Sequence, residues 1–199
     1  MSSTVFMGDT SGSVTLTVPA VAGSNTITLP AVTGTAVISG QNSAITSGTA
    51  QASTSGTSID FTGIPSWVKR ITVMFNGVST SGTSNIIIQI GVSGTPTTSG
   101  YLSVGFGSIG AGVASTVFTT GFGLRDANSA AYVYSGNANI TNLTSNTWSF
   151  GATMAVTSGS GTAVGGGSLA LGGTLNMVRI TTVNGTDTFD AGSINILWE

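Results

Sequence analysis

The chain has 199 residues, of which 5% are charged; four Lys or Arg stand against six Asp or Glu, giving a formal net charge of −2. It contains no His and no Cys, which excludes Ser-His-Asp and Cys-His triads, zinc sites of the His/Cys kind, disulfides and an imidazole pH switch. Four cations cannot build the basic surface of a phosphate-tracking protein, so we expect no nucleic-acid partner.

The mean hydropathy of +0.40 is high for a chain that we expect to be soluble. Its apolar runs, such as Ile86–Ile88, are interrupted within a few residues by Gly, Ser, Thr or Gln, whereas a membrane-spanning helix needs about 20 apolar residues. We therefore expect no membrane insertion. Because small soluble domains usually carry charge on about a quarter or more of their surface, so little charge predicts a protein that works inside an assembly.

Residues 1–57 predict an extended arm and linker rather than a domain of their own. The run Thr15–Val21 (TLTVPAV) recurs eleven residues later as Thr26–Val32 (TITLPAV), and each copy is a short strand that runs into a proline. Two such strands bury too little apolar area to be stable alone, although a flexible leader is the alternative reading. We expect the arm to attach the chain to sister subunits or to a larger body through the apolar and proline residues of the repeat, namely Val18, Pro19, Val21, Leu29, Pro30 and Val32. Residues 40–58, which are small and polar without periodicity, predict the linker.

Residues 58–199 predict an all-β domain, an antiparallel, jelly-roll-like β-sandwich without helices. Short alternating segments are separated by turns such as Asn76-Gly77 and Asn184-Gly185, and Asn-Gly between strands is a strong hairpin signal. We expect the core to hold the aromatic side chains Phe61, Trp67, Phe75, Phe118, Trp148, Phe150, Phe189 and Trp198. The expected strands are Lys69–Asn76, Asn85–Ile90, Thr116–Phe122, Ala131–Tyr134, Thr147–Val156, Leu175–Val183 and Ser193–Trp198.

The few charged residues give little support for catalysis. Asp187 and Asp190 form the closest carboxylate pair, which could begin a cation site or serve glycoside hydrolysis, but their place beside a turn favours hydrogen bonds to nearby amides. We expect Asp60 to pair with Lys69 or Arg70. Arg125-Asp126 is either a subunit-interface pair or a solvated turn. No cofactor, metal site or enzymatic activity is therefore predicted.

Two tyrosines and an Asn-rich run are the candidates for contact with a receptor. Tyrosine and asparagine on loops combine flat apolar area with hydrogen-bonding groups, which suits a sugar or protein surface. The candidates are Tyr132, Tyr134, Asn137, Asn139 and Asn142. For the two tyrosines, which share one strand face, a place in the core or at a subunit interface is the alternative.

Three stretches resemble bacteriophage tail-fibre and other virion-appendage proteins. Gly12–Gly34 is similar to the opening of many phage fibre chains, Asp60–Phe75 to the first strands of a domain near their C-termini, and Val178–Trp198 to the final hairpin of that domain. The resemblance implies a homotrimer whose N-terminal arm attaches to the particle and whose C-terminal β-domain faces outward. It supplies no catalytic residues.

Together these observations predict a non-enzymatic structural protein of a virion. The expected function is a short trimeric tail fibre that is attached by its arm and adheres to the host surface. Its expected partners are other virion proteins (tail hub, adaptor or capsid) and a host cell-surface glycan or protein. The alternative is a capsid decoration or cement protein that stabilises the head shell.

Overall fold

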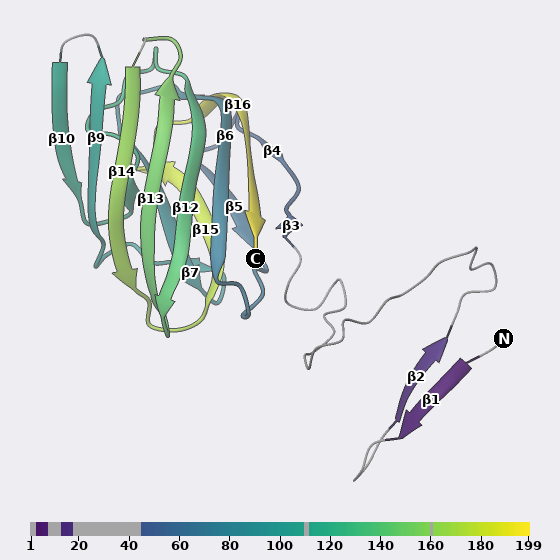
Figure 1. The fold of residues 1–199 in the computed structure, drawn as a ribbon. Coiled ribbons are helices and arrows are strands. Elements are labelled where there is room, and N and C mark those ends of the chain that lie inside the picture. The colour runs from purple at the N-terminus through teal and green to yellow at the C-terminus, as the bar shows by residue number, and fades with distance from the viewer. Residues whose placement is uncertain (1–2, 8–12, 18–44, 110–111, 160) are drawn as a thin grey trace. The chain divides into compact units, whose positions relative to one another are not determined.

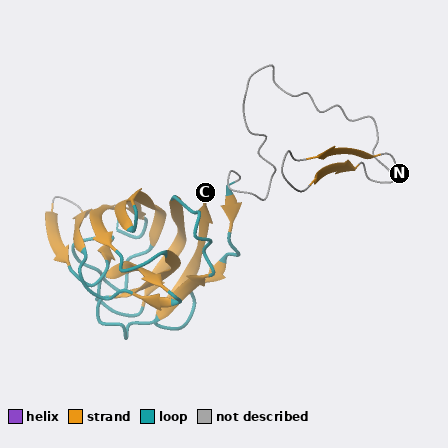
Figure 2. Ribbon diagram, turned by 90° about the horizontal axis from the view of Figure 1, so that it is seen from below, coloured by secondary structure: helices purple, strands orange, loops and turns teal. Residues whose placement is uncertain are grey.

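A computed structural model describes residues 3–7, 13–17, 45–109, 112–159 and 161–199. The chain divides into two compact units, Met1–Ala36 and Val37–Glu199. No helix occurs among the described residues, and thus none that could cross a membrane. The expected all-β class is confirmed: the larger unit consists of two antiparallel sheets packed face to face (Figures 1 and 2).

The larger sheet has nine strands in the order β10-β9-β14-β13-β12-β6-β16-β3, with β4 also pairing with β16 (Figure 1). In the order across the sheet, the strands are β10 (Gly112–Phe118), β9 (Leu102–Ile109), β14 (Gly161–Ala170), β13 (Thr147–Val156), β12 (Tyr134–Thr144), β6 (Arg70–Thr80), β16 (Phe189–Trp198), β3 (Thr46–Ser47) and β4 (Gln51–Ala52).

The smaller sheet has five strands in the order β11-β7-β15-β5, with β8 also pairing with β7. These strands are β11 (Phe122–Gly123), β7 (Ile86–Val92), β15 (Leu175–Thr182), β5 (Ser58–Thr62) and β8 (Thr95–Pro96).

The core lies between the two sheets and is built by strict alternation in the larger one. In β13, every second residue from Trp148 to Val156 is buried while its neighbours are exposed. Phe122 of the smaller sheet stacks on Phe150 of the larger sheet with ring centroids 4.6 Å apart, and it meets Tyr101 edge-on at 4.8 Å. Of the eight aromatic residues expected in the core, six are buried, and Trp67 and Trp198 are partly buried against it.

Two strands of the larger sheet, β9 and β14, were not expected because they are rich in glycine. Most of these glycines face inward, where a neighbouring segment leaves no room for a side chain, whereas Gly166 is exposed. A Cβ added at Gly107 would lie 2.1 Å from a carboxylate oxygen of Asp126, and one at Gly165 would lie 2.2 Å from the carbonyl oxygen of Gly123. Glycine here marks a close approach of backbone within a sheet, not a turn.

Several expected elements have different bounds in the structure. The strand expected over Ala131–Tyr134 is wrong for its first three residues, because β12 begins only at Tyr134, so Tyr132 and Tyr134 do not share a strand face. The single strand expected over Thr116–Phe122 is two strands, because β10 ends at Phe118 in one sheet and β11 begins at Phe122 in the other. The Asn-rich run, read as a loop, is largely strand: β12 begins at Tyr134 and pairs with β13 as far as Thr144. Asn137 and Asn139 occupy outward positions that alternate with the fully buried Ala138 and Ile140, whereas Asn142 is half-buried.

The linker interpretation of residues 40–58 is wrong from residue 45 onward. Strands β3 and β4 pair with β16, and the side chain of Ser53 is fully buried, donating a hydrogen bond of 2.8 Å to the carbonyl oxygen of Ala191. Small polar residues lack a hydrophobic period, but they can add short strands to a sheet edge through backbone hydrogen bonds. The expected boundary at residue 58 therefore falls inside the larger compact unit.

The described part of the N-terminal unit is a hairpin. Strand β1 (Ser3–Met7), which the sequence did not indicate, pairs antiparallel with β2 (Ser13–Thr17), the beginning of the first repeat copy. The six residues expected to mediate attachment and trimerisation (Val18, Pro19, Val21, Leu29, Pro30 and Val32) lie outside the described residues.

Candidate functional site

The two tyrosine candidates belong to the core side of the sandwich rather than to its surface. Tyr134 is 1% exposed, and its hydroxyl donates a hydrogen bond of 2.9 Å to Oδ1 of Asn128. Burial raises the pKa of the Tyr134 hydroxyl well above its ordinary value. Tyr132 packs against the core, and the guanidinium carbon of Arg125 lies 4.8 Å from its ring centroid. Of the positions that the sequence left open, Tyr134 therefore takes the one in the core.

The asparagine candidates divide into two kinds. Asn137 and Asn139 are exposed on the outward side of β12, where Asn139 accepts a hydrogen bond of 2.8 Å from the hydroxyl of Thr72. Asn142 instead organises the β12–β13 turn, because its amide donates to the carbonyl oxygens of Ser145 and Thr147. Asn137 and Asn139 thus lie where a large ligand could touch them, whereas the amide of Asn142 is occupied.

The two neighbouring aspartates are held by different partners. The Asp187 carboxylate accepts hydrogen bonds from the side-chain amide of Asn184 at 2.7 Å and from the backbone N–H of Ser84 at 2.9 Å. Only the first partner is close in sequence, and it is a side chain, so the expected bonds to nearby backbone amides are not what holds this carboxylate. The Asp190 carboxylate accepts from the hydroxyl of Ser79. Within the described ranges, no group of three or more acidic residues gathers as a metal site would require.

Two other charged pairs correct one expectation and narrow another. Asp60 does not pair with Lys69 or Arg70. Instead, the guanidinium of Arg179 donates two hydrogen bonds, of 2.7 and 2.6 Å, to the Asp60 carboxylate. These hydrogen bonds raise the pKa of Arg179. Arg125–Asp126 is buried within the chain, with side chains only 7% and 10% exposed, so the alternative of a solvated turn is wrong. The glycines of β9 leave room for this buried pair.

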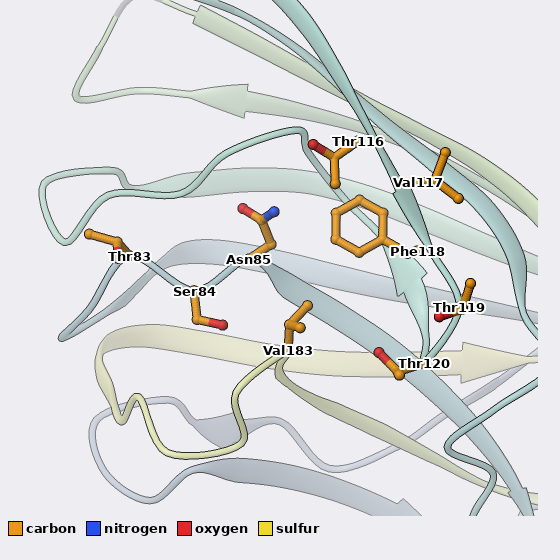
Figure 3. A pocket seen from close by; sticks show the side chains of 9 residues that line it. All are labelled: Thr83, Ser84, Asn85, Thr116, Val117, Phe118, Thr119, Thr120 and Val183. Carbon is orange, nitrogen blue, oxygen red and sulfur yellow. The ribbon is translucent and has the colours of Figure 1, made fainter.

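A pocket of about 340 Å³ opens where the end of β10 meets the β6–β7 loop (Figure 3). Its lining has five hydroxyl side chains, one amide and three apolar side chains, and no charged group. The lining residues are Thr83, Ser84, Asn85, Thr116, Val117, Phe118, Thr119, Thr120 and Val183.

Asn85 is fixed in this pocket by a shared carbonyl. Its amide nitrogen donates to the carbonyl oxygen of Asp126 at 3.0 Å, and the hydroxyl of Thr116 donates to the same oxygen at 2.8 Å. The amide oxygen of Asn85 is buried and has no hydrogen-bond partner in the described part of the chain. The pocket therefore offers an anchored amide, several hydroxyls and apolar walls, and its volume lies at the small end of the usual range for ligand sites. This chemistry suits a neutral, hydroxyl-rich ligand about the size of one sugar unit.

The sequence did not predict this pocket. Its residues come from the β6–β7 loop, from β10 and the segment after it, and from Val183 after β15, and only tertiary folding brings them together. In a chain so rich in Ser and Thr, hydroxyl residues carry no positional signal of their own. No family model, no curated protein and no solved structure matches this chain.

Proposed function

We propose that this chain is a structural protein of a bacteriophage virion: a short homotrimeric tail fibre, attached by its N-terminal arm, whose jelly-roll-like sandwich domain adheres to a host-surface glycan. The proposal has no enzymatic step. It draws on the resemblance noted in the sequence and on the division of the chain into a small N-terminal unit and a large β-sandwich.

The distribution of charge is the observation that carries the proposal. All three arginines form ion pairs within the chain, Arg70 with Glu199, Arg125 with Asp126 and Arg179 with Asp60. Little free charge is left to keep separate copies apart in solution. Such a surface fits a protein that works as part of a larger assembly.

The location is tested on the particle itself. An epitope-tagged chain is introduced into the phage that encodes it, and labelled virions are imaged and their copy number is measured. We expect label on the tail, with a few dozen copies or fewer per particle. Label over the head at several hundred copies would instead favour the capsid decoration protein, and virions without label would refute both.

Deletion of residues 1–36 tests the role of the arm. This deletion ends at the boundary between the compact units and spares β3, β4 and the buried Ser53, all of which a truncation at Ile59 would remove. We expect the shortened chain to keep its β-rich circular dichroism and to be missing from the virion. Undiminished incorporation would refute attachment by the arm.

The adhesion step is tested at the uncharged pocket. We expect Asn85→Ala to weaken adsorption to host cells and binding to neutral host oligosaccharides, because it removes an anchored polar side chain from the pocket lining. Asn137→Ala, on the exposed side of β12, is the matched control that changes another asparagine outside the pocket. Loss of adsorption in Asn137→Ala but not in Asn85→Ala would move the receptor site to β12.

A further inference from the structure

One end of the larger sheet presents an exposed apolar surface. On the outward side of β9, β10 and β14, Val104 lies opposite Val117 and Phe106 lies opposite Val164, so the side chains form one continuous patch. We call this surface the β10 face. Its large apolar residues, exposed by 37–74%, are Leu102, Val104, Phe106, Val113, Val117 and Val164.

The same side of the sheet is polar farther from β10. The outward residues of β13 and β12 include Ser149, Thr153, Asn137 and Asn139, all exposed. By contrast, the outward positions of β9, β10 and β14 hold the six large apolar side chains of the β10 face. The change occurs within one continuous sheet, so the apolar patch is a local feature and not a general property of the surface.

The edge of the sheet at this face lacks the usual protection. Within the described ranges β10 pairs only with β9, and its register runs without a bulge from Gly112 to Phe118 (Figure 1). Proteins normally protect such an edge with lysine, proline or a bulge, because free N–H and C=O groups invite another chain. None of these devices occurs in β10.

The size of the patch matches what a stable interface requires. If an exposed aliphatic or Phe side chain offers about 100–150 Å², the six side chains present roughly 400 Å² of apolar area. One side of a standard protein interface covers about 800 Å², of which somewhat more than half is apolar. The β10 face therefore supplies most of the apolar part of one such side.

We propose that the β10 face is the surface through which copies of this chain pack against one another. A charged partner gains nothing from this face, since it carries no charge, whereas the β10 faces of other copies match it in chemistry when they meet around the symmetry axis of the assembly. The inference deepens the proposed function and rests on its trimer for the number of copies. The face itself is assigned independently of any virion.

Sedimentation of the full-length chain tests the assignment. We expect the wild-type chain to sediment as a trimer, and the double variant Val113→Lys/Val117→Lys to require about a hundredfold higher concentration to associate, because lysines would have to be buried at the contact. Leu143→Lys is the matched control: Leu143 is 72% exposed, Val117 is 71% exposed, and Leu143 lies on β12 away from the face. If the wild-type chain is a dimer and its association depends on these valines, the β10 face is still the contact surface, but the number of copies is two and not three. A wild-type monomer would overturn the inference.

A labelling experiment distinguishes association through the β10 face from association through the N-terminal arm alone. Because the chain has no cysteine, Ser115→Cys places one thiol on the β10 face, opposite Phe106, and Asn137→Cys places one on the exposed side of β12. We expect maleimide to label Ser115→Cys about tenfold more slowly than Asn137→Cys, since interface cores exclude solvent. Equal labelling rates would overturn the inference about the β10 face, even if the chain is found in virions. Slow labelling of Ser115→Cys in a chain that is absent from virions would keep the β10 face and refute only the proposed function.

Discussion

Replacing Asp126 with asparagine tests how the buried ion pair contributes to stability. The Nε of Arg125 lies 3.2 Å from Oδ1 of Asp126, and Nη1 of the same guanidinium is buried without a hydrogen-bond partner among the described residues. Asparagine preserves the shape of the side chain but leaves the buried cation without its counter-charge. Breaking a buried pair in this way costs about 3–5 kcal/mol. The Tyr132 ring beside the guanidinium offsets part of this, so we expect a loss of about 3 kcal/mol.

Urea unfolding followed by tryptophan fluorescence measures this loss. For a domain of this size, about 3 kcal/mol corresponds to a fall in Tm of roughly 6–12 °C. Glu199→Gln is the control, because the Arg70–Glu199 pair is 50% and 31% exposed and such pairs contribute about 0–1 kcal/mol. The double variant Arg125→Met/Asp126→Asn, which removes both charges, is expected to recover most of the stability. The reasoning is refuted if Asp126→Asn loses no more than Glu199→Gln, or if the double variant is less stable than Asp126→Asn.

Three further predictions concern the packing of the sandwich. Gly107→Ala should destabilise by about 2 kcal/mol or more in urea unfolding, since its Cβ would overlap the buried ion pair, whereas Gly151→Ala, with no atom within 4 Å of the added Cβ, should be neutral or slightly stabilising; equal effects would refute the close approach. Burial raises the pKa of both Tyr101 and Tyr134, so the free energy of unfolding should fall above about pH 10, where the unfolded tyrosines ionise and the folded ones do not, by up to about 1.4 kcal/mol per pH unit for each tyrosine. Tyrosine-to-phenylalanine variants should flatten that slope in urea titrations at pH 9–11, and an unchanged slope would contradict it. Ser53→Ala should cost about 1–2 kcal/mol because it leaves a main-chain carbonyl of the sheet without its donor, and no change in stability would show that this segment is not part of the sandwich.

In the larger sheet, the strands that could be predicted from the sequence are those whose burial alternates. β6 and β13 bury bulky residues at every second position over most of their length, so a period of two is visible in the sequence. β9 and β14 are equally regular in the structure, but their inward positions are mostly glycine, and the hydrophobic pattern disappears where another segment takes the place of a side chain. β3 and β4 were missed for a related reason: they pair with β16 through their backbones and need no hydrophobic pattern of side chains.

The candidate site was less predictable because it depends on tertiary neighbours. The sequence could not indicate that Arg179, more than a hundred residues away, would bind Asp60, because β5 and β15 become neighbours only in the folded sheet. Tyr134 and Asn137 lie three residues apart in one strand, yet one is in the core and the other on the surface. Choosing receptor-contact candidates by residue type alone therefore selects buried residues together with exposed ones.

The pocket and the β10 face meet at Val117, which lines the first and belongs to the second. If copies pack through the β10 face, one wall of the pocket lies at the rim of the contact, so assembly and binding of a ligand are expected to influence each other. The coupling is reciprocal, since a ligand that prefers the assembled form also stabilises the assembly. A trimeric fibre binds its host through several weak sites at once, and its affinity rises because the sites are linked. In the proposed arrangement, each binding site lies beside the contact between copies that links it to the others. Under the proposed function, assembly and adhesion would therefore both depend on the edge of the sheet at β10.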